Sequence, residues 1–279
     1  MNSPRPPDSE WPQHDLVRWE IGLTAPATRA FPLTDRLTIG GSDVILMAGP
    51  CSVESEDQIM SAARAVKAAG AAVLRGGAFK PRTSPNTFQG LGAEGLKLLR
   101  QAGDAVGLPV VTEVMAHTDV DLVAQHAHIL QIGSRSMQNY PLLRAVGETK
   151  LPVILKRGFA ATVEEWIGSA DHIRSRGNGR IILCERGIRA VETATRFTLD
   201  INAVPLMHRL CDLPIIVDPS HATGRADLVP EVSRAALAAG ADGLLIEVHP
   251  NPALALSDGA QSLAVDQFAD LVPSLRRIA

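Results

Sequence analysis

Four residues of this sequence have side chains that bind divalent transition metals: Cys51, His221, Glu247 and Asp258. Thiolate, imidazole and carboxylate groups form a mixed set of soft and hard donors, which suits an ion such as Mn, Fe, Co or Zn. Taken singly, each has a simpler explanation, since a lone cysteine is usually a buried core residue and a lone histidine a structural one. Their positions after the strands described below favour a metal site.

A second set of residues is cationic. Its members are Arg75, Lys80, Arg82, Arg135, Lys156 and Arg186. Arginine offers two parallel donors to a phosphate or carboxylate group, and lysine acts as a mobile point charge. Any one of these residues could pair with a surface glutamate, but six that converge need anions, because unpaired buried charge is costly. We therefore predict a site for phosphorylated, carboxylated metabolites.

The segment 76–85, with the sequence GGAFKPRTSP, follows Arg75. Its glycines permit close approach to the backbone, and its prolines stiffen the loop. Its hydroxyl groups are further donors to phosphate. The segment therefore adds weight to a phosphate site beside the cationic residues.

Eight short apolar runs of strand type precede these residues. They span 44–48, 72–74, 110–112, 129–132, 153–155, 181–183, 215–217 and 244–246. The runs are nearly continuous in β-branched residues and leucine, as expected of parallel strands that are covered on both faces. An open, doubly wound sheet would show the same local alternation of strands and helices. The count of eight, with chemistry at nearly every strand end, favours a (β/α)8 TIM barrel of the α/β class.

The barrel explains how the two sets converge. Its first, seventh and eighth strands are neighbours, so Cys51, His221 and Glu247 would meet, with Asp258 in the loop after the eighth strand. The remaining strand ends lead to Arg75, Glu113, Arg135, Lys156 and Arg186. Since barrel enzymes carry their active sites at the C-terminal ends of the strands, the sequence predicts one active-site face.

Helix boundaries are visible between the strands. The segments 55–69 and 93–106 have helical spacing and stop at Gly70 and Gly107, which suit the residue after a helix. Thr162, followed by acidic residues, opens another helix as an N-cap. The segment 229–239 ends at Gly240 and has a proline in its first turn.

The chain divides into two predicted parts. Residues 1–42 form an N-terminal extension with a proline-rich, mobile start, and residues 43–279 form the catalytic barrel. The segment 37–39, the Gly40-Gly41-Ser42 sequence and the following apolar run predict a hairpin that leads into the first barrel strand.

Composition excludes several classes of protein. The 279 residues are 46% hydrophobic and 20% charged, which is ordinary for a globular chain and excludes wholesale disorder. No run approaches the ~18 apolar residues of a membrane span, and no signal-peptide pattern is present, so we expect a cytoplasmic protein. Three cysteines argue against a disulfide framework. A net charge of −3 without a polybasic arm argues against nucleic-acid binding.

Longer motifs resemble the class I 3-deoxy-D-arabino-heptulosonate 7-phosphate (DAHP) synthases, and most closely their bacterial Iβ subgroup. The motifs are AGPCS (48–52), LRGGAFKPRTSP (74–85), QIGSR (131–135), LKRGF (155–159), LCERG (183–187), DPSH (218–221), IEVHP (246–250) and LSDG (256–259). Their number and order make the resemblance far more specific than any single short pattern. Ser134 stands where this family is expected to have alanine.

The resemblance implies a metal-dependent, aldol-like condensation. Phosphoenolpyruvate, D-erythrose 4-phosphate and water would give DAHP and phosphate, the first step of the shikimate pathway to the aromatic amino acids. Carried over by position, the metal ligands are Cys51, His221, Glu247 and Asp258, the phosphoenolpyruvate-binding residues are Arg75, Lys80, Arg135, Lys156 and Arg186, and the erythrose 4-phosphate-binding residues are Lys80, Pro81, Arg82 and Thr83. Lys156, Lys80 and Glu113 are the expected catalytic residues: Lys156 as a proton donor or electrostatic stabiliser, and Glu113 as a positioner of water or substrate.

Two other functions remain open at this point. The first is 3-deoxy-manno-octulosonate 8-phosphate synthase, a family that resembles Lys-Ala-Asn-Arg where this chain has Lys80-Pro81-Arg82-Thr83. The second is a non-catalytic regulatory or binding subunit. By analogy we expect a homo-oligomer, a dimer or a tetramer. Only about 40 residues precede the first barrel strand, so we expect no N-terminal regulatory domain and no built-in site for aromatic amino acids.

Overall fold

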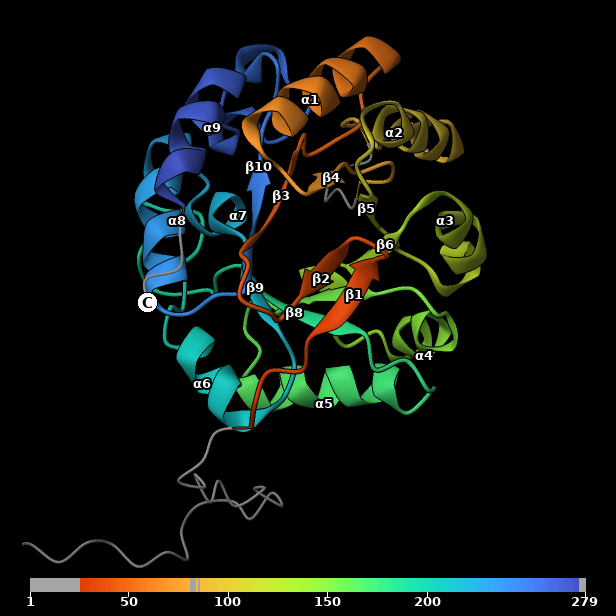
Figure 1. The fold of residues 1–279 in the computed structure, drawn as a ribbon, viewed down its shortest axis with the longest axis vertical. Coiled ribbons are helices and arrows are strands. Elements are labelled where there is room, and N and C mark those ends of the chain that lie inside the picture. The colour runs from red at the N-terminus through yellow and green to blue at the C-terminus, as the bar shows by residue number, and fades with distance from the viewer. Residues whose placement is uncertain (1–25, 81–83, 85, 276–279) are drawn as a thin grey trace, which may run out of the picture.

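The computed structural model of the chain describes residues 26–80, 84 and 86–275. Within this part, eight parallel strands close into a barrel (Figure 1). They are β3 (Ile45–Gly49), β4 (Val73–Arg75), β5 (Val110–Glu113), β6 (Ile129–Ile132), β7 (Val153–Lys156), β8 (Ile181–Glu185), β9 (Ile215–Val217) and β10 (Gly243–Glu247). The last strand pairs with the first, from Gly243 opposite Ile45 to Glu247 opposite Gly49. The predicted (β/α)8 fold is confirmed, and each predicted run coincides with a barrel strand.

Helices surround the barrel (Figure 1). They are α1 (Glu56–Ala69), α2 (Ala93–Val106), α3 (Val120–His126), α4 (Tyr140–Glu148), α5 (Val163–Arg174), α6 (Ala203–Leu210), α7 (Pro219–Thr223), α8 (Val229–Ala238) and α9 (Val265–Leu271). Ser55 caps α1 by accepting a hydrogen bond from the backbone N–H of Gln58, and Gly70 ends it with φ 103°. Thr162 and Glu165 form a capping box at the start of α5. No helix of the described residues is long and apolar enough to cross a membrane.

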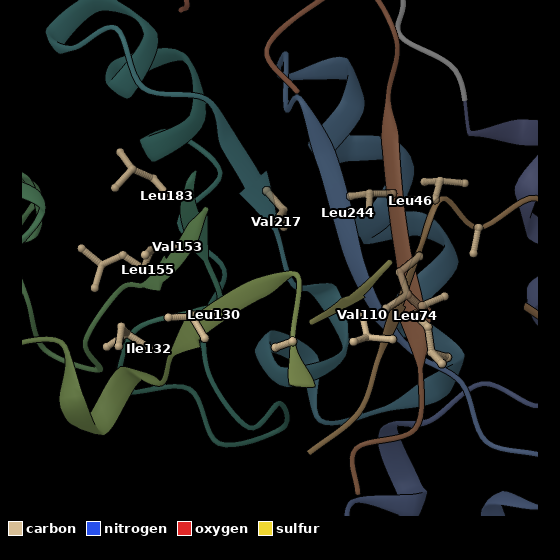
Figure 2. Packing of buried hydrophobic residues seen from close by; sticks show 14 of the residues in the cluster. Leu46, Leu74, Val110, Leu130, Ile132, Val153, Leu155, Leu183, Val217 and Leu244 are labelled. Atoms are coloured by element: carbon tan, nitrogen blue, oxygen red, sulfur yellow. The ribbon is translucent and has the colours of Figure 1, made fainter. Parts of the chain in front are cut away.

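Outward-facing strand residues pack against the helices. Figure 2 labels ten of them: Leu46, Leu74, Val110, Leu130, Ile132, Val153, Leu155, Leu183, Val217 and Leu244. Trp166 of α5 is fully buried in the same layer, and its indole N–H donates to the carbonyl oxygen of Leu155 at 3.0 Å. The indole therefore fills the space between helix and strand without leaving its one donor unpaired.

Inward-facing strand residues form a separate apolar core along the barrel axis. This core contains Ile45, Met47, Val73, Val111, Ile129, Ile154, Ile182, Cys184, Ile216 and Leu245. Successive side chains alternate across a strand, so the residue two positions later faces the axis again. At the C-terminal end of the barrel these residues are Arg75, Glu113, Gln131, Lys156, Asp218 and Glu247. The same alternation therefore builds an apolar interior and places a charged layer above it.

A β-hairpin closes the other end of the barrel. β1 (Phe31–Thr34) pairs antiparallel with β2 (Leu37–Ile39), and Figure 1 shows the pair lying across the barrel. Phe31, Leu33 and Ile39 are buried in the axial core. The sequence predicted a hairpin in this extension that leads into the first barrel strand, and the β1–β2 hairpin lies directly ahead of β3. β3 itself uses both of its edges within the barrel, one for β10 and one for β4.

The boundary after residue 42 therefore remains a proposal, because the hairpin shares its core with the barrel. We expect Ile39→Ala, which removes a fully buried side chain, to lower the free energy of unfolding by about 2–5 kcal/mol. Chemical denaturation followed by circular dichroism measures this change. The neighbouring exposed Thr38→Ala should change it by less than about 0.5 kcal/mol. Equal effects of the two substitutions would contradict a hairpin that is part of the core.

Candidate active site

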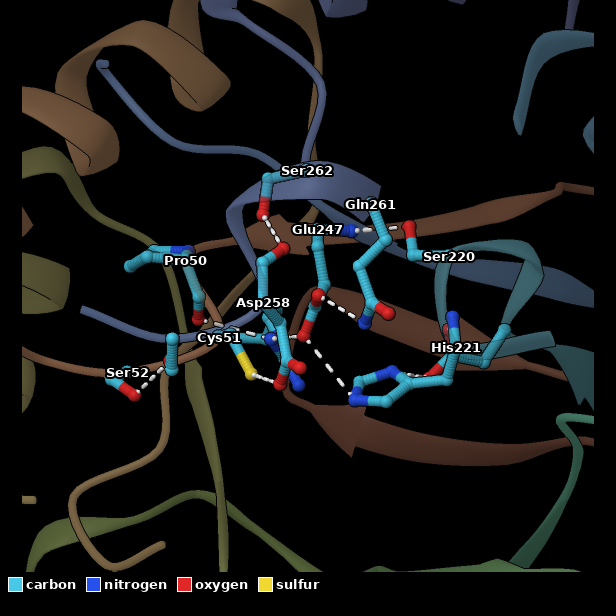
Figure 3. Close-up of polar contacts among 12 residues, drawn as sticks. Pro50, Cys51, Ser52, Ser220, His221, Glu247, Asp258, Gln261 and Ser262 are labelled. Carbon is cyan, nitrogen blue, oxygen red and sulfur yellow. Dashed lines mark hydrogen bonds and ion pairs between the residues drawn. The ribbon is translucent and has the colours of Figure 1, made fainter. Parts of the chain in front are cut away.

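Four potential metal ligands meet at the C-terminal end of the barrel. Cys51 follows β3, His221 lies in α7, Glu247 ends β10, and Asp258 precedes the 3₁₀ turn Gly259–Gln261. One donor atom from each residue lies within 4.8 Å of the others. In Figure 3 the four side chains point toward one another. The fold therefore brings the four predicted ligands into one cluster.

The chain can turn Cys51 into this cluster because residue 49 is glycine. Gly49 has φ 146°, and a Cβ atom on it would lie 2.2 Å from the carbonyl oxygen of Arg75. Only glycine fits so close to the neighbouring strand in this conformation. The backbone then continues through Pro50, and the thiol of Cys51, which is 2% exposed, faces the other ligands.

Asp218 fixes the imidazole of His221. It caps α7 by accepting a hydrogen bond from the backbone N–H of His221 at 2.9 Å, and its Oδ2 lies 2.7 Å from Nδ1 of the same residue. With the proton on Nδ1, Nε2 is left to bind a metal; it lies 3.4 Å from Oε1 of Glu247. Burial lowers the pKa of His221 to about 4, so the imidazole is neutral at pH 7.

Asp218 is not among the predicted site residues, although it is central to the site. Its Oδ2 also forms a buried ion pair with Nζ of Lys156. The aspartate therefore links the candidate metal ligands to the cationic residues. The signal that could have found it is the Asp218-Pro219 sequence after a strand, since aspartate is a preferred N-cap and proline a preferred first helical residue.

Glu247 is held from two sides. Nη1 of Arg75 lies 2.7 Å from its Oε1, and Nε2 of Gln261 donates to its Oε2 at 2.6 Å. Burial by itself raises the pKa of this carboxyl, but His221 and Arg75 outweigh it and hold the pKa below its ordinary value. The carboxylate is therefore ionised and oriented. Gln261 is a second residue that the sequence did not single out.

Cys51 is a protonated thiol in this arrangement. Burial, with a further contribution from Glu247, raises its pKa to about 12. The thiol donates to Oδ2 of Asp258 at 2.8 Å, and Nζ of Lys80 donates to the sulfur at 2.7 Å. Burial also acts to raise the pKa of Asp258, but the hydrogen bond from Cys51 and the nearby His221, Lys80 and Arg196 together outweigh it, so the pKa lies below its ordinary value.

These donors fit a divalent transition metal. The set contains one neutral imidazole, two ionised carboxylates and one thiol that can lose its proton. A mixed set of nitrogen, oxygen and sulfur donors is typical of sites for the later first-row ions. Asp218 forms a hydrogen bond with His221, and Gln261 donates one to Glu247. These bonds orient the two ligands, as metal-binding side chains require.

A cavity lined by cations adjoins this cluster. Its lining includes Lys80, Arg135, Lys156, Arg186 and Arg196, together with Glu113, His221 and Asp258. A second, narrower cavity contains Arg75, Cys51 and Gln131, and shares Lys80, Glu113, Lys156 and His221 with the first. The candidate metal ligands and the cationic residues therefore lie around two adjoining cavities that share part of their lining.

Two stacked phenylalanine rings support the arginines. Phe159 and Phe197 lie parallel, with ring centroids 4.9 Å apart. The guanidinium of Arg186 lies 4.2 Å from the Phe197 centroid, and that of Arg135 lies 5.5 Å from the Phe159 centroid. Cation–π attraction offsets part of the repulsion between neighbouring guanidinium groups. Neither Phe197 nor Arg196 was predicted as a site residue, because both come from the long β8–α6 connection.

Arg186 is well placed to bind an anion. Its side chain is buried, and Nη1 has no hydrogen-bond partner among the described residues. Burial, opposed by Asp218 and reinforced by Arg196, lowers its pKa to about 10. A buried guanidinium with an unused donor is costly unless a ligand completes it.

Glu113 ends β5 and faces the same space. Nε2 of Gln131 donates to its Oε2 at 3.2 Å. A Cβ atom on Gly133 would lie 2.1 Å from its Oε1, so this glycine leaves room for the carboxylate. Three predicted site residues, Pro81, Arg82 and Thr83, lie outside the described residues. The other predicted site residues line the two cavities or belong to the ligand cluster: residues 51, 75, 80, 113, 135, 156, 186, 221, 247 and 258.

The fold and the site define a (β/α)8-barrel protein with a candidate metal centre and an anion-binding cavity at its C-terminal face. The model of the DAHP synthetase I family matches residues 25–277. The chain belongs to this family.

Individual relatives agree with the family. The phospho-2-dehydro-3-deoxyheptonate aldolase of Thermotoga maritima is 53% identical over 241 residues, which cover 86% of this chain and 71% of that protein. A crystal structure of the enzyme of that name from Thermotoga maritima matches with a TM-score of 0.86 and 52% identity, over 89% of this chain and 72% of that one. A 2-dehydro-3-deoxyphosphooctonate aldolase of Koribacter versatilis is more distant, at 33% identity over 261 residues, 86% of this chain and 92% of that protein.

The pKa values of the four ligands predict how metal binding depends on pH. The imidazole and both carboxylates are already deprotonated at pH 7, so only Cys51 must release a proton when a metal binds. We expect the affinity for Co²⁺ to rise roughly tenfold per pH unit between about pH 6 and 8. Calorimetric titration in buffers of different ionisation enthalpy should show one proton released. Cys51→Ala should bind more weakly and lose this pH dependence; a pH-independent affinity of the unmodified protein would contradict the assignment.

Proposed function

We propose that this chain is a 3-deoxy-7-phosphoheptulonate synthase. It condenses phosphoenolpyruvate with D-erythrose 4-phosphate and water to give DAHP and phosphate, the entry step of the shikimate pathway. The observation that carries the proposal is that the ligand cluster adjoins the cationic cavity, with His221 and Asp258 in the lining of that cavity. Family membership and 53% identity to a phospho-2-dehydro-3-deoxyheptonate aldolase support the choice of reaction.

The cationic residues would bind phosphoenolpyruvate. Arg186 has an unused buried donor for a phosphate oxygen, and Arg135 and Lys156 face the same cavity. Arg75 and Lys80 lie deeper, next to the metal ligands, where a carboxylate of the same substrate would complete the charge balance. Holding the enol phosphate in one orientation is the main contribution of these residues to the rate.

The second substrate would enter above the metal ligands. A divalent metal held by Cys51, His221, Glu247 and Asp258 supplies Lewis-acid polarisation of the aldehyde oxygen. Erythrose 4-phosphate would be bound by Lys80 and by Pro81, Arg82 and Thr83; this assignment rests on the resemblance of the KPRT motif. Lys80 lines both cavities, so it would contact both substrates.

The reaction forms one carbon–carbon bond and one carbon–oxygen bond, the latter to water, and breaks the carbon–oxygen bond to phosphate; the aldehyde oxygen gains a proton and the added water loses one. C3 of phosphoenolpyruvate attacks the aldehyde carbon, water adds at C2, and phosphate leaves from the resulting tetrahedral carbon. Lys156 is the proton donor or the electrostatic stabiliser, and its ion pair with Asp218 keeps the ammonium in place. Glu113, held by Gln131, would position the water or the substrate.

Finer properties belong to the same proposal. The metal is Mn, Fe, Co or Zn, the protein is cytoplasmic, and it assembles as a dimer or a tetramer. The ligand set supports a transition metal without selecting one ion, since affinity order and availability decide which ion is bound.

Product formation with two aldehydes tests the reaction. We expect the purified protein with Mn²⁺ to release phosphate from phosphoenolpyruvate when erythrose 4-phosphate is present, and at least tenfold more slowly with arabinose 5-phosphate. A chelator should abolish the activity, and added metal should restore it. A preference for the five-carbon aldehyde would favour the octulosonate synthase, and no turnover with either would favour the binding subunit.

Substitution of Arg186 tests the assignment of phosphoenolpyruvate. Arg186→Gln removes a charge-assisted hydrogen bond of about 1.5–3 kcal/mol, so the KM for phosphoenolpyruvate should rise about 10–100-fold. The KM for erythrose 4-phosphate and the affinity for Mn²⁺ should stay nearly unchanged. The matched control is Arg225→Gln, because Arg225 is exposed and pairs with Asp227. An unchanged KM for phosphoenolpyruvate in Arg186→Gln would remove this residue from the site.

A further inference from the structure

Asp258 is the proposed metal ligand that lies in a loop and has an unusual backbone conformation. It lies in the segment 249–258, which we call the Asp258 loop, between β10 and the turn Gly259–Gln261. Its φ is 53°, and among the described residues it is the only non-glycine with positive φ. A residue other than glycine keeps such a conformation only where its surroundings enforce it. The contacts of the loop should therefore show what enforces it.

One contact joins the sequence neighbours of two metal ligands. Ser52 follows Cys51, and Ser257 precedes Asp258; their hydroxyl groups form a hydrogen bond, and both residues are buried. Figure 3 shows Ser52 beside this part of the cluster. The distance between the backbones that carry Cys51 and Asp258 is thus set by a contact one residue away from each.

A second contact uses the carboxylate of Glu54. Its Oε1 accepts a hydrogen bond from the backbone N–H of Leu256 at 2.9 Å, two residues before Asp258. Its Oε2 lies 3.4 Å from Nε2 of His249, at the start of the same loop. Nδ1 of His249 accepts a hydrogen bond from the backbone N–H of Asn251 at 3.0 Å, so Nε2 carries the proton and donates to Glu54. One carboxylate therefore spans the loop from its start to its end.

The segment that carries Glu54 is itself fixed. The backbone N–H of Glu54 donates to Oε1 of Gln58 at 3.2 Å, and Nε2 of Gln58 donates to the carbonyl oxygen of Ser52 at 3.1 Å. Gln58 belongs to α1, which packs on the barrel. On the outer side of the loop the side chains of Leu254 and Leu256 are exposed. The contacts of Ser52 and Glu54 hold the loop from the side of Cys51.

We propose that Glu54 and the Ser52–Ser257 pair are positioning residues that hold Asp258 at ligand distance from Cys51. The inference rests on the proposed metal site and extends it to residues that bind no metal themselves. Beyond Asp258 the chain is anchored by its own turn, because the carbonyl oxygen of Asp258 accepts from the backbone N–H of Gln261 and from the hydroxyl of Ser262. Loss of the Glu54 contacts would leave that turn, the Ser52–Ser257 pair and the ion pair of Asp258 with Arg196 at 3.2 Å. The loop would be released at His249 and Leu256, and Asp258 would be held less firmly in its position.

Metal affinity in the variants Glu54→Ala and Ser257→Ala tests the inference. Substitution of residues that orient ligands typically weakens metal binding about 10–100-fold, and we expect this loss for Co²⁺ in competition with a chelator. The absorption of the Co²⁺–thiolate bond of Cys51 should remain, because Cys51 still binds. Glu54→Gln keeps an oxygen that can accept from the backbone N–H of Leu256, but its amide N–H group would face the N–H donor of His249. We therefore expect an intermediate loss of Co²⁺ affinity in this variant. The matched controls are Glu231→Ala and Ser175→Ala, whose side chains are exposed.

Each outcome bears on one proposal. Unchanged Co²⁺ affinity in both variants, with normal binding by the unmodified protein, would overturn the positioning role and leave the proposed function intact. Failure of the unmodified protein to bind Co²⁺ would instead overturn the metal site. The unfolding midpoint of the metal-free variants separates positioning from stability. An unchanged midpoint with weakened Co²⁺ binding supports positioning, and a lowered midpoint with unchanged binding contradicts it.

Discussion

The closure of β10 on β3 is the constraint on which the site depends. The register sets Glu247 opposite Gly49, so the last strand of the barrel delivers one ligand beside the turn that delivers Cys51. These residues are almost 200 positions apart in sequence, and no local structure could hold them together. Closure also leaves β3 without a free edge, which directs the N-terminal hairpin to the floor of the barrel. The pairing of β10 with β3 thus affects both ends of the barrel: it places the candidate ligands at one end and leaves the hairpin to pack at the other.

Buried charges connect the two halves of the site. Arg75 pairs with Glu247, a candidate metal ligand, while Lys156 pairs with Asp218, which orients His221, another candidate ligand. Each pair joins a cationic residue of the cavity to the metal cluster. A change at one half therefore alters the hydrogen bonds of the other, since breaking a buried pair leaves an uncompensated charge. Arg186 stands outside these pairs, and its unused donor makes the cavity receptive to an anion.

Most of the fold was predictable because its signals are local. Buried strands appear as apolar runs, and Gly70 and Gly107 mark helix ends through their backbone conformation. The strand-end residues follow from the same runs, but their roles came from longer motifs. The roles of Gln261 and Phe197 could not be predicted, since each depends on contacts with segments that are distant in sequence. The pairing of β1 with β2 is local, but only the fold shows that the hairpin packs on the axial core of the barrel. Asp218 had a local signal as an N-cap, yet its contacts with Lys156 and His221 are visible only in three dimensions.

The protonation of Cys51 links metal binding to substrate binding. Without a metal, the charges of Glu247 and Asp258 are balanced by Arg75 and Lys80, and the neutral thiol and the neutral imidazole add nothing. A divalent ion that replaces the thiol proton adds two positive charges and leaves one new negative charge, so the formal charge of the cluster rises by one. In a cavity where Nη1 of Arg186 has no hydrogen-bond partner among the described residues, this added charge favours a multiply charged anion such as phosphoenolpyruvate. The ion supplies this attraction, whereas the buried thiol weakens metal binding at low pH and, as a thiolate, limits the gain in positive charge to one unit.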